Sequence, residues 1–126
     1  VRSEGQVEWQ QFSTPPMLAW LLAKAAMMSS HDTLLEPSAG NGALAIWADG
    51  RVGALQLNEI DSCRRDCLAH IFPDASLTAH DGELIGELHR SRAPSVIVMN
   101  PPFARSQERG RDGGAAMRHL RSALRA

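Results

Sequence analysis

The chain has 126 residues, of which 44% are hydrophobic, and its formal net charge is −1. These values predict one globular domain with a core of its own and argue against a disordered tail. The longest apolar stretch, residues 17–28, is interrupted by Lys24 and is too short to span a bilayer, and no signal peptide opens the sequence. We therefore expect a cytoplasmic protein that does not enter a membrane.

The first third of the sequence predicts a helix, a strand and a second helix. Residues 13–16, "STPP", place a hydroxyl cap before two prolines, which suits the first turn of a helix that ends near Met28. This helix is apolar nearly all round, so we expect it to be buried on most sides. Residues 33–36 then predict a buried strand, and residues 43–49 predict a helix.

Strand and helix patterns continue to alternate along the rest of the chain. Residues 61–72 predict a helix whose apolar side carries Cys67, Leu68, Ile71 and Phe72. The other expected elements are strands at 54–58, 76–79 (weak) and 95–99 (strong, "SVIVM"), a short helix at 83–90, and a last helix at 113–126 with Met117, Leu120 and Leu124 at helical spacing.

Strands separated by helices of this length require right-handed crossovers and give a parallel sheet that is covered on both faces. The sequence therefore predicts a doubly wound, Rossmann-like α/β fold with about four strands and an N-terminal helix. We expect residues 1–126 to form a single, partial domain of this type.

The two cysteines, Cys63 and Cys67, are four residues apart and would share one face of the helix at 61–72. No second pair of cysteines or histidines stands at a spacing typical of zinc sites. Two reduced thiols are therefore favoured over a metal site, and we expect no metal.

Charge is distributed unevenly along the chain. Residues 1–63 contain three basic and seven acidic side chains, whereas residues 64–126 contain ten basic and seven acidic ones. The late basic residues include Arg105, Arg109, Arg111, Arg118, Arg121 and Arg125. A basic segment favours an anionic partner, although an arginine run is more often a solvated surface.

In doubly wound sheets ligands bind beyond the carboxyl ends of the strands, so residues that follow the strands are the candidates for function. The segment "GNGALA" after the first strand satisfies the loose dinucleotide fingerprint, with an acid seventeen residues further on at Glu59. A dinucleotide would place its pyrophosphate near Glu36, with no obvious group to neutralise the repulsion. A cationic ligand removes this conflict.

S-adenosylmethionine is such a ligand, because it carries a sulfonium and an ammonium group and no phosphate. Glu59 could accept hydrogen bonds from its ribose hydroxyls, and Asp81 could meet its adenine amino group. Each acid alone could equally cap a helix or lie in a solvated loop. At the fourth strand end, "NPPF" at 100–103 forms a rigid loop that fixes one carbonyl beside the Asn100 side chain.

The segments "QFSTPP", "LLEPSAGNG", "LNEID", "HDGE" and "NPPF" resemble, in order and spacing, the class I methyltransferases that methylate exocyclic amino groups. The closest resemblance is to bacterial and phage DNA adenine methyltransferases, the type found in restriction–modification systems. The opening "VRSEGQVEWQQFSTPP" further resembles the methylase-like segment of large phage and plasmid proteins that also carry a strawberry-notch-type helicase. This resemblance implies DNA as a partner and linked or associated helicase domains.

The resemblance also implies roles for individual residues. Contacts to the cofactor are implied for Phe12, Thr14 and Pro15 (methionine part), Glu36, Ser38, Gly40 and Gly42 (floor), Glu59 (ribose) and Asp81 (adenine). The catalytic loop would consist of Asn100, Pro101, Pro102 and Phe103. In it, Asn100 and the carbonyl of Pro101 would hold the target amino group, and Phe103 would stack on a flipped base.

A full domain of this family has seven strands and a separate target-recognition region. The present chain departs from the family because only about four strands and no recognisable target-recognition region are predicted in it. We therefore expect a fragment of a larger protein, inactive by itself, that could self-associate through the bare edge of the fourth strand. Two other functions remain open. One is methylation of a protein glutamine amide, and the other is a non-catalytic module that binds the cofactor or a nucleic acid.

Overall fold

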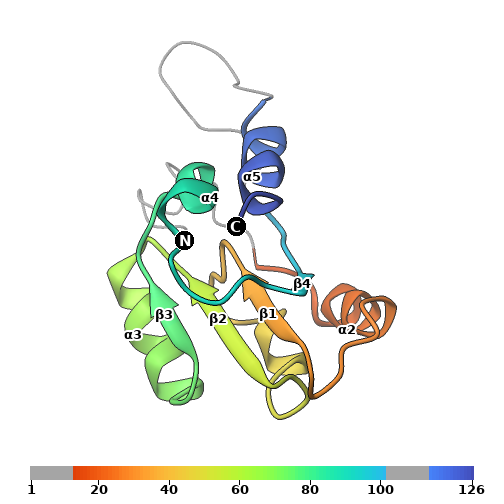
Figure 1. Cartoon of the computed structure of the whole chain (residues 1–126). Helices are drawn as coiled ribbons and strands as arrows, with labels where there is room; N and C mark the ends of the chain where they lie inside the picture. Colours follow the sequence, from red (N-terminus) through yellow and green to blue (C-terminus); the bar gives the residue numbers. More distant parts are fainter. Residues whose placement is uncertain (1–12, 102–113) are drawn as a thin grey trace.

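A computed structural model describes residues 13–101 and 114–126 (Figure 1). In these residues four strands form one parallel sheet in the order β3-β2-β1-β4. The strands are β1 (Thr33–Glu36), β2 (Ala54–Asn58), β3 (Ser76–Thr78) and β4 (Val96–Ile97). The predicted doubly wound α/β fold is confirmed. Strand order reverses between β1 and β4, and in such sheets this switch point is where ligands bind.

Helical segments cover both faces of the sheet. They are α2 (Pro16–Ala25), the 3₁₀ turn η1 (Ala45–Trp47), α3 (Ser62–Ile71), the 3₁₀ turn η2 (Gly82–Leu84), α4 (Ile85–Leu88) and α5 (Ala115–Ala123). One core cluster joins α2, η1 and α3 to the sheet, and a second joins α4 and α5 to the opposite face. The neighbouring residues Leu34 and Leu35 belong to different clusters because successive side chains of a strand point to opposite faces.

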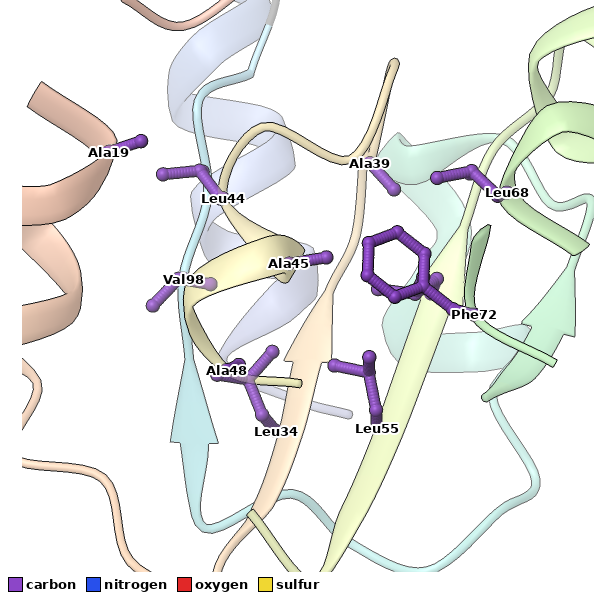
Figure 2. Close-up of a cluster of buried hydrophobic side chains, with 11 residues drawn as sticks. Ala19, Leu34, Ala39, Leu44, Ala45, Ala48, Leu55, Leu68, Phe72 and Val98 are labelled. Atoms are coloured by element: carbon purple, nitrogen blue, oxygen red, sulfur yellow. The ribbon is translucent and has the colours of Figure 1, made fainter. Parts of the chain in front are cut away.

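Figure 2 shows the larger cluster, in which Phe72 from the end of α3 lies over the sheet and Ala45 of η1 points into the same space. Val98 and Leu34 extend this cluster toward Ala19 of α2. Burial of these side chains fixes η1, and with it the loop between β1 and η1, against the sheet. The position of that loop is therefore a consequence of core packing.

The expected helix at 43–49 is wrong in extent, because only the 3₁₀ turn η1 forms there. Gly42 precedes it and Gly50 follows it, and both have positive φ, at 80° and 67°. Backbone of this kind cannot continue a right-handed helix. The helix expected at 83–90 is also divided, into η2 and α4, and the fourth strand has two assigned residues where five were expected.

Helix α2 differs from expectation in its cap and in its burial. Pro15 is its N-cap, with no side-chain hydrogen bond, so the predicted hydroxyl cap is wrong. The expectation that the helix is buried on most sides is also wrong, because Met17 is 68% exposed and Leu18 53% exposed. Its buried residues are Ala19 and Ala23, small side chains that let the helix backbone approach the core closely.

Helix α3 begins at a well-formed cap, where the Asp61 side chain accepts a hydrogen bond from the backbone N–H of Arg64. On its expected apolar side Leu68 and Phe72 are buried, but Cys67 and Ile71 are exposed. The inclusion of the last two residues in the apolar side was therefore wrong. In the described parts of the chain, no group of three or more His, Cys, Asp or Glu side chains could hold a metal ion.

Helix α5 buries Ala115, His119, Ser122 and Ala123, while its large apolar side chains face outward. The latter are Met117, Leu120 and Leu124. None of the helices within residues 13–101 and 114–126 combines the length and apolar character needed to cross a membrane.

Candidate functional site

A pocket lies where the carboxyl ends of β1 and β4 meet the segment that leads into α2. Its lining comes from the residues before α2, the loop after β1, the first turn of α3 and the end of β4. The lining residues are Ser13, Thr14, Glu36, Ser38, Ala39, Gly40, Asn41, Ala43, Arg64 and Asn100. Five of the site residues predicted from the sequence are therefore brought together: Thr14, Glu36, Ser38, Gly40 and Asn100.

The two glycines of the loop after β1 have different surroundings. Gly40 and Gly42 both have positive φ, at 59° and 80°. A Cβ on Gly42 would lie 2.7 Å from Cε2 of Phe72, whereas the nearest atom to one on Gly40 would be Nη1 of Arg64 at 3.6 Å. Gly42 therefore lets the loop pack against α3 and does not line the pocket, while Gly40 leaves the pocket floor open.

Glu59, at the end of β2, holds the loop in place. Its carboxylate accepts hydrogen bonds from the backbone N–H of Gly40 at 2.7 Å and of Asp61 at 2.8 Å. Burial raises the pKa of Glu59, and the two N–H donors oppose that rise. Glu59 thus positions the glycine loop, and its predicted contact with a ribose stays a prediction.

Glu36 ends the central strand and is only 2% exposed. The backbone N–H of Ala45 donates a hydrogen bond to its carboxyl group, and its Oε2 atom has no partner among the described residues. Burial raises the pKa of Glu36 well above its usual value, and the negative charge of Glu59 raises it further. The pocket lining therefore includes a carboxyl group whose ionisation is disfavoured by burial and one of whose oxygens, Oε2, is buried and unsatisfied.

Asn100 connects the end of β4 to the residues before α2. Its Nδ2 donates a hydrogen bond to Oγ1 of Thr14 at 3.1 Å, and Asn41 makes a similar bond to Oγ of Ser13 at 3.1 Å. The orientation of the Asn100 amide is thus set by its amino end, which leaves the amide oxygen able to accept a hydrogen bond.

The other predicted site residues lie away from the pocket lining or outside the described residues. Pro15 is the exposed N-cap of α2, and Asp81 is half-buried and caps η2 by accepting a hydrogen bond from the Glu83 N–H at 3.0 Å. Pro101 is half-buried directly after Asn100. Three residues lie outside the described parts of the chain: Phe12, Pro102 and Phe103.

Sequence reasoning missed two residues that shape the site. Asn58 is buried at the end of β2, where its Nδ2 donates to the carbonyls of Pro37 and His80, and its Oδ1 accepts from the N–H of His80. It therefore joins the loops that follow β1 and β3. Arg64 brings a positive charge to the pocket. It could have been identified from the sequence, because it lies in the first turn of the helix that Asp61 caps shortly after the second strand.

No family model matches the chain, and no curated protein sequence matches it. Solved structures do match. A proposed RNA methyltransferase from Pyrococcus horikoshii aligns with a TM-score of 0.69 and 20% identity, over 94% of this chain and 60% of its own. A dimethyladenosine transferase from Plasmodium falciparum aligns at 0.59 and 20% identity, over 71% and 33%. A proposed methyltransferase from Streptococcus mutans in complex with SAH aligns at 0.61 and 9% identity, over 90% and 66%.

These structures share an architecture with the chain, while their low identities keep the likeness at the level of the fold. The chain spans about three-fifths of the length of the Pyrococcus protein and a third of that of the Plasmodium protein. The alignments with the Pyrococcus and Streptococcus proteins extend over 94% and 90% of this chain. The chain therefore has the Rossmann-like α/β fold found in S-adenosylmethionine-dependent methyltransferases.

Proposed function

We propose that the protein transfers a methyl group from S-adenosylmethionine to an exocyclic amino group of a nucleic-acid base. The observation that carries the proposal is the pairing, in one pocket, of the buried Glu36 carboxyl with the Asn100 amide. The first suits a cationic ligand, and the second suits an amine that needs a hydrogen-bond acceptor. Because both residues line one pocket of a methyltransferase fold, the cofactor and the acceptor amine could be bound next to each other.

The residues of the pocket fit the cofactor. The unsatisfied Oε2 of Glu36 can accept a hydrogen bond from, or pair with, a cationic group, and Gly40 presents backbone without a side chain. Arg64 offers a partner for the carboxylate of the methionine part. A pyrophosphate would instead meet Glu36 at close range. The SAH found in the Streptococcus structure, which is the demethylated product of adenosylmethionine, adds support from the fold.

The reaction requires positioning more than acid–base chemistry. The lone pair of an aryl amine is delocalised into its ring, and acceptors that bind the amino hydrogens favour the pyramidal geometry that frees it. Asn100 would provide one acceptor through its amide oxygen, because its amino end is held by Thr14. The Pro101 carbonyl would provide a second. Holding the amine in line with the methyl group could contribute about 7–11 kcal/mol at best.

The chain should bind adenosylmethionine or its demethylated product, because it contains all of the residues that we assign to the cofactor, and those that the structure describes lie before β4. Calorimetry should detect this binding, and Glu59→Ala should weaken it by about 1–3 kcal/mol, since the turn around Gly40 loses a charged hydrogen-bond acceptor. Glu87→Ala, on the exposed side of α4, provides the matched control and should bind normally. Tighter binding of a nicotinamide dinucleotide than of adenosylmethionine would contradict the assignment.

For the acceptor, the sequence pattern favours adenine in DNA, whereas the names of the structural neighbours refer to RNA and to dimethyladenosine. The deciding assay offers DNA, RNA and protein side by side to the longest form of the protein that carries this chain, followed by mass analysis of nucleosides and peptides. We expect methyl groups on adenine nitrogen. Methyl groups only on cytosine carbon, or only on protein glutamine, would contradict the proposal.

We further propose that the segment of 126 residues binds the cofactor but does not turn over alone, and that it associates with itself or with helicase domains. Strand β4 pairs only with β1 among the strands of the described sheet, so its outer side is an edge. Exposed edges recruit further strands. Light scattering over a dilution series should show a dimer that dissociates on dilution, and a monomer at every concentration would count against pairing through this edge.

A further inference from the structure

Glu36 is a buried carboxyl group that the described residues satisfy only in part. The side chain is 2% exposed and belongs to a residue of the pocket lining, one backbone N–H donates to it, and its buried Oε2 atom has no partner in the described residues. A buried carboxylate with one unsatisfied oxygen is costly, and the group avoids this cost by binding a proton.

In the described residues Glu36 has no dedicated counter-ion. The ionisable groups nearest the carboxyl ends of the strands include Glu59 and Asp61 after β2, Arg64 on α3, His80 and Asp81 after β3, and His119 on α5. Glu59 is negative and opposes ionisation of Glu36. Arg64 lines the same pocket, but its charge acts on Glu59, whose ionisation it favours. Among the described residues no cation pairs with Glu36, and a positively charged ligand would supply this charge.

We propose that Glu36 is protonated in the ligand-free protein and releases this proton when a cationic ligand such as adenosylmethionine enters the pocket. The O–H bond of the carboxyl group breaks, the proton passes to the solvent, and the carboxylate pairs with the ligand cation. This inference rests on the proposed function, because it assumes that adenosylmethionine occupies the pocket. It makes Glu36 a specificity-determining residue that selects a cation over a neutral or anionic ligand.

The coupling between proton release from Glu36 and cation binding predicts the direction in which affinity changes with pH. Burial raises the pKa of Glu36 in the free protein, and a bound cation would lower it. Between these two pKa values one proton leaves on binding, so affinity for the cation rises with pH by up to about tenfold per pH unit. Above the pKa of Glu36 in the free protein, ionisation of Glu36 no longer makes the affinity depend on pH. A neutral ligand gains nothing from ionisation, so its affinity should not rise in this way.

The test is calorimetric titration of the whole chain with adenosylmethionine, at one pH near neutrality in phosphate and in Tris, which differ in their enthalpies of ionisation. The dependence of the heat on the buffer gives the number of protons released. We expect up to about one proton for wild type and for Glu87→Gln, an exposed glutamate control, and about one proton fewer for Glu36→Gln. Adenosine, which carries no cation, should release none from wild type.

Each outcome decides a separate point. Adenosylmethionine binding without proton release from wild type, or with equal release from Glu36→Gln, would overturn the inference and leave the cofactor assignment standing. Absence of adenosylmethionine binding would overturn both. Titration of the ligand's own amino group is common to wild type and variant, so it cancels in their difference. If Glu36→Gln does not fold, the contrast between adenosylmethionine and adenosine on wild type decides the question when it is measured at about pH 6, well below the usual α-amino pKa of about 7.7–8.0, where the amino group of the ligand is already protonated.

Discussion

Gly42→Ala should reduce the free energy of unfolding by about 2–5 kcal/mol. Two costs add. The backbone at Gly42 has a φ of 80°, and a side chain in left-handed backbone costs roughly 1–2 kcal/mol. The new Cβ would also lie 2.7 Å from Cε2 of Phe72 and 3.1 Å from Cδ2 of Leu68, both buried, and overpacking of a core typically costs about 1–3 kcal/mol. Urea unfolding followed by circular dichroism measures the sum.

Gly50→Ala is the matched control for this prediction. Gly50 also has a positive φ, 67°, but a Cβ there would meet no atom within 4 Å. Only the backbone cost of roughly 1–2 kcal/mol should remain. Equal losses at the two positions would show that Phe72 and Leu68 yield to the methyl group, and that the loop is not fixed by its packing on α3.

Gly40→Ala separates stability from binding. Its φ of 59° gives the same backbone cost, and the neighbouring Arg64 guanidinium at 3.6 Å leaves room for a methyl group. Stability should therefore fall about as much as in Gly50→Ala. Because Gly40 lines the pocket and Gly50 does not, only Gly40→Ala should also weaken adenosylmethionine binding. The two glycines of the loop thus serve different purposes, which their shared motif does not reveal.

The strands could be predicted where the sequence pattern and the tertiary environment agree. Residues 33–36 and 54–58 are short runs bounded by turn residues, and they occupy the centre of the sheet, so local pattern and burial coincide. Helices α2 and α5 show the opposite case. In α2 and α5 the core contact is made by small residues such as Ala19 and Ala123, while the larger apolar side chains face outward. Hydrophobicity alone cannot identify the buried face of a helix when small residues form that face and let the helix backbone approach the core closely.

The part of the site that lies at the carboxyl ends of the strands could be predicted from the sequence. Glu36 and Asn100 meet because parallel strands bring their carboxyl ends to one edge, and the order of β1 and β4 makes them neighbours. The roles of Asn58 and Glu59 were not predictable in the same way. Both bind backbone groups of loops that come from other strands, at distances of 2.7–3.0 Å. Such long-range contacts leave no periodic signal in a sequence.

Asn100→Ala should lower kcat for methyl transfer by about 100-fold or more in the active protein that carries this chain. The amide oxygen is expected to hold the acceptor amine, and a misplacement of about 1 Å can cost a factor of 10². Adenosylmethionine affinity, measured by calorimetry, should change by less than about threefold, because an interaction made with the acceptor affects turnover and not cofactor binding.

Thr14 provides the matched test of how Asn100 works. Its hydroxyl accepts the Asn100 Nδ2–H at 3.1 Å, which holds the amide by its amino end and leaves the amide oxygen able to accept a hydrogen bond. Thr14→Val keeps the shape but removes the acceptor, so kcat should fall by about tenfold, less than in Asn100→Ala, because the amide is present but free to rotate. Thr14→Ser retains the hydroxyl and should restore most of the rate. If Thr14→Val and Thr14→Ser were equally active, the hydrogen bond would not orient Asn100. If Asn100→Ala instead weakened cofactor binding strongly and left kcat at saturating cofactor unchanged, Asn100 would belong to the cofactor site, and the acceptor amine would have to be held by other groups.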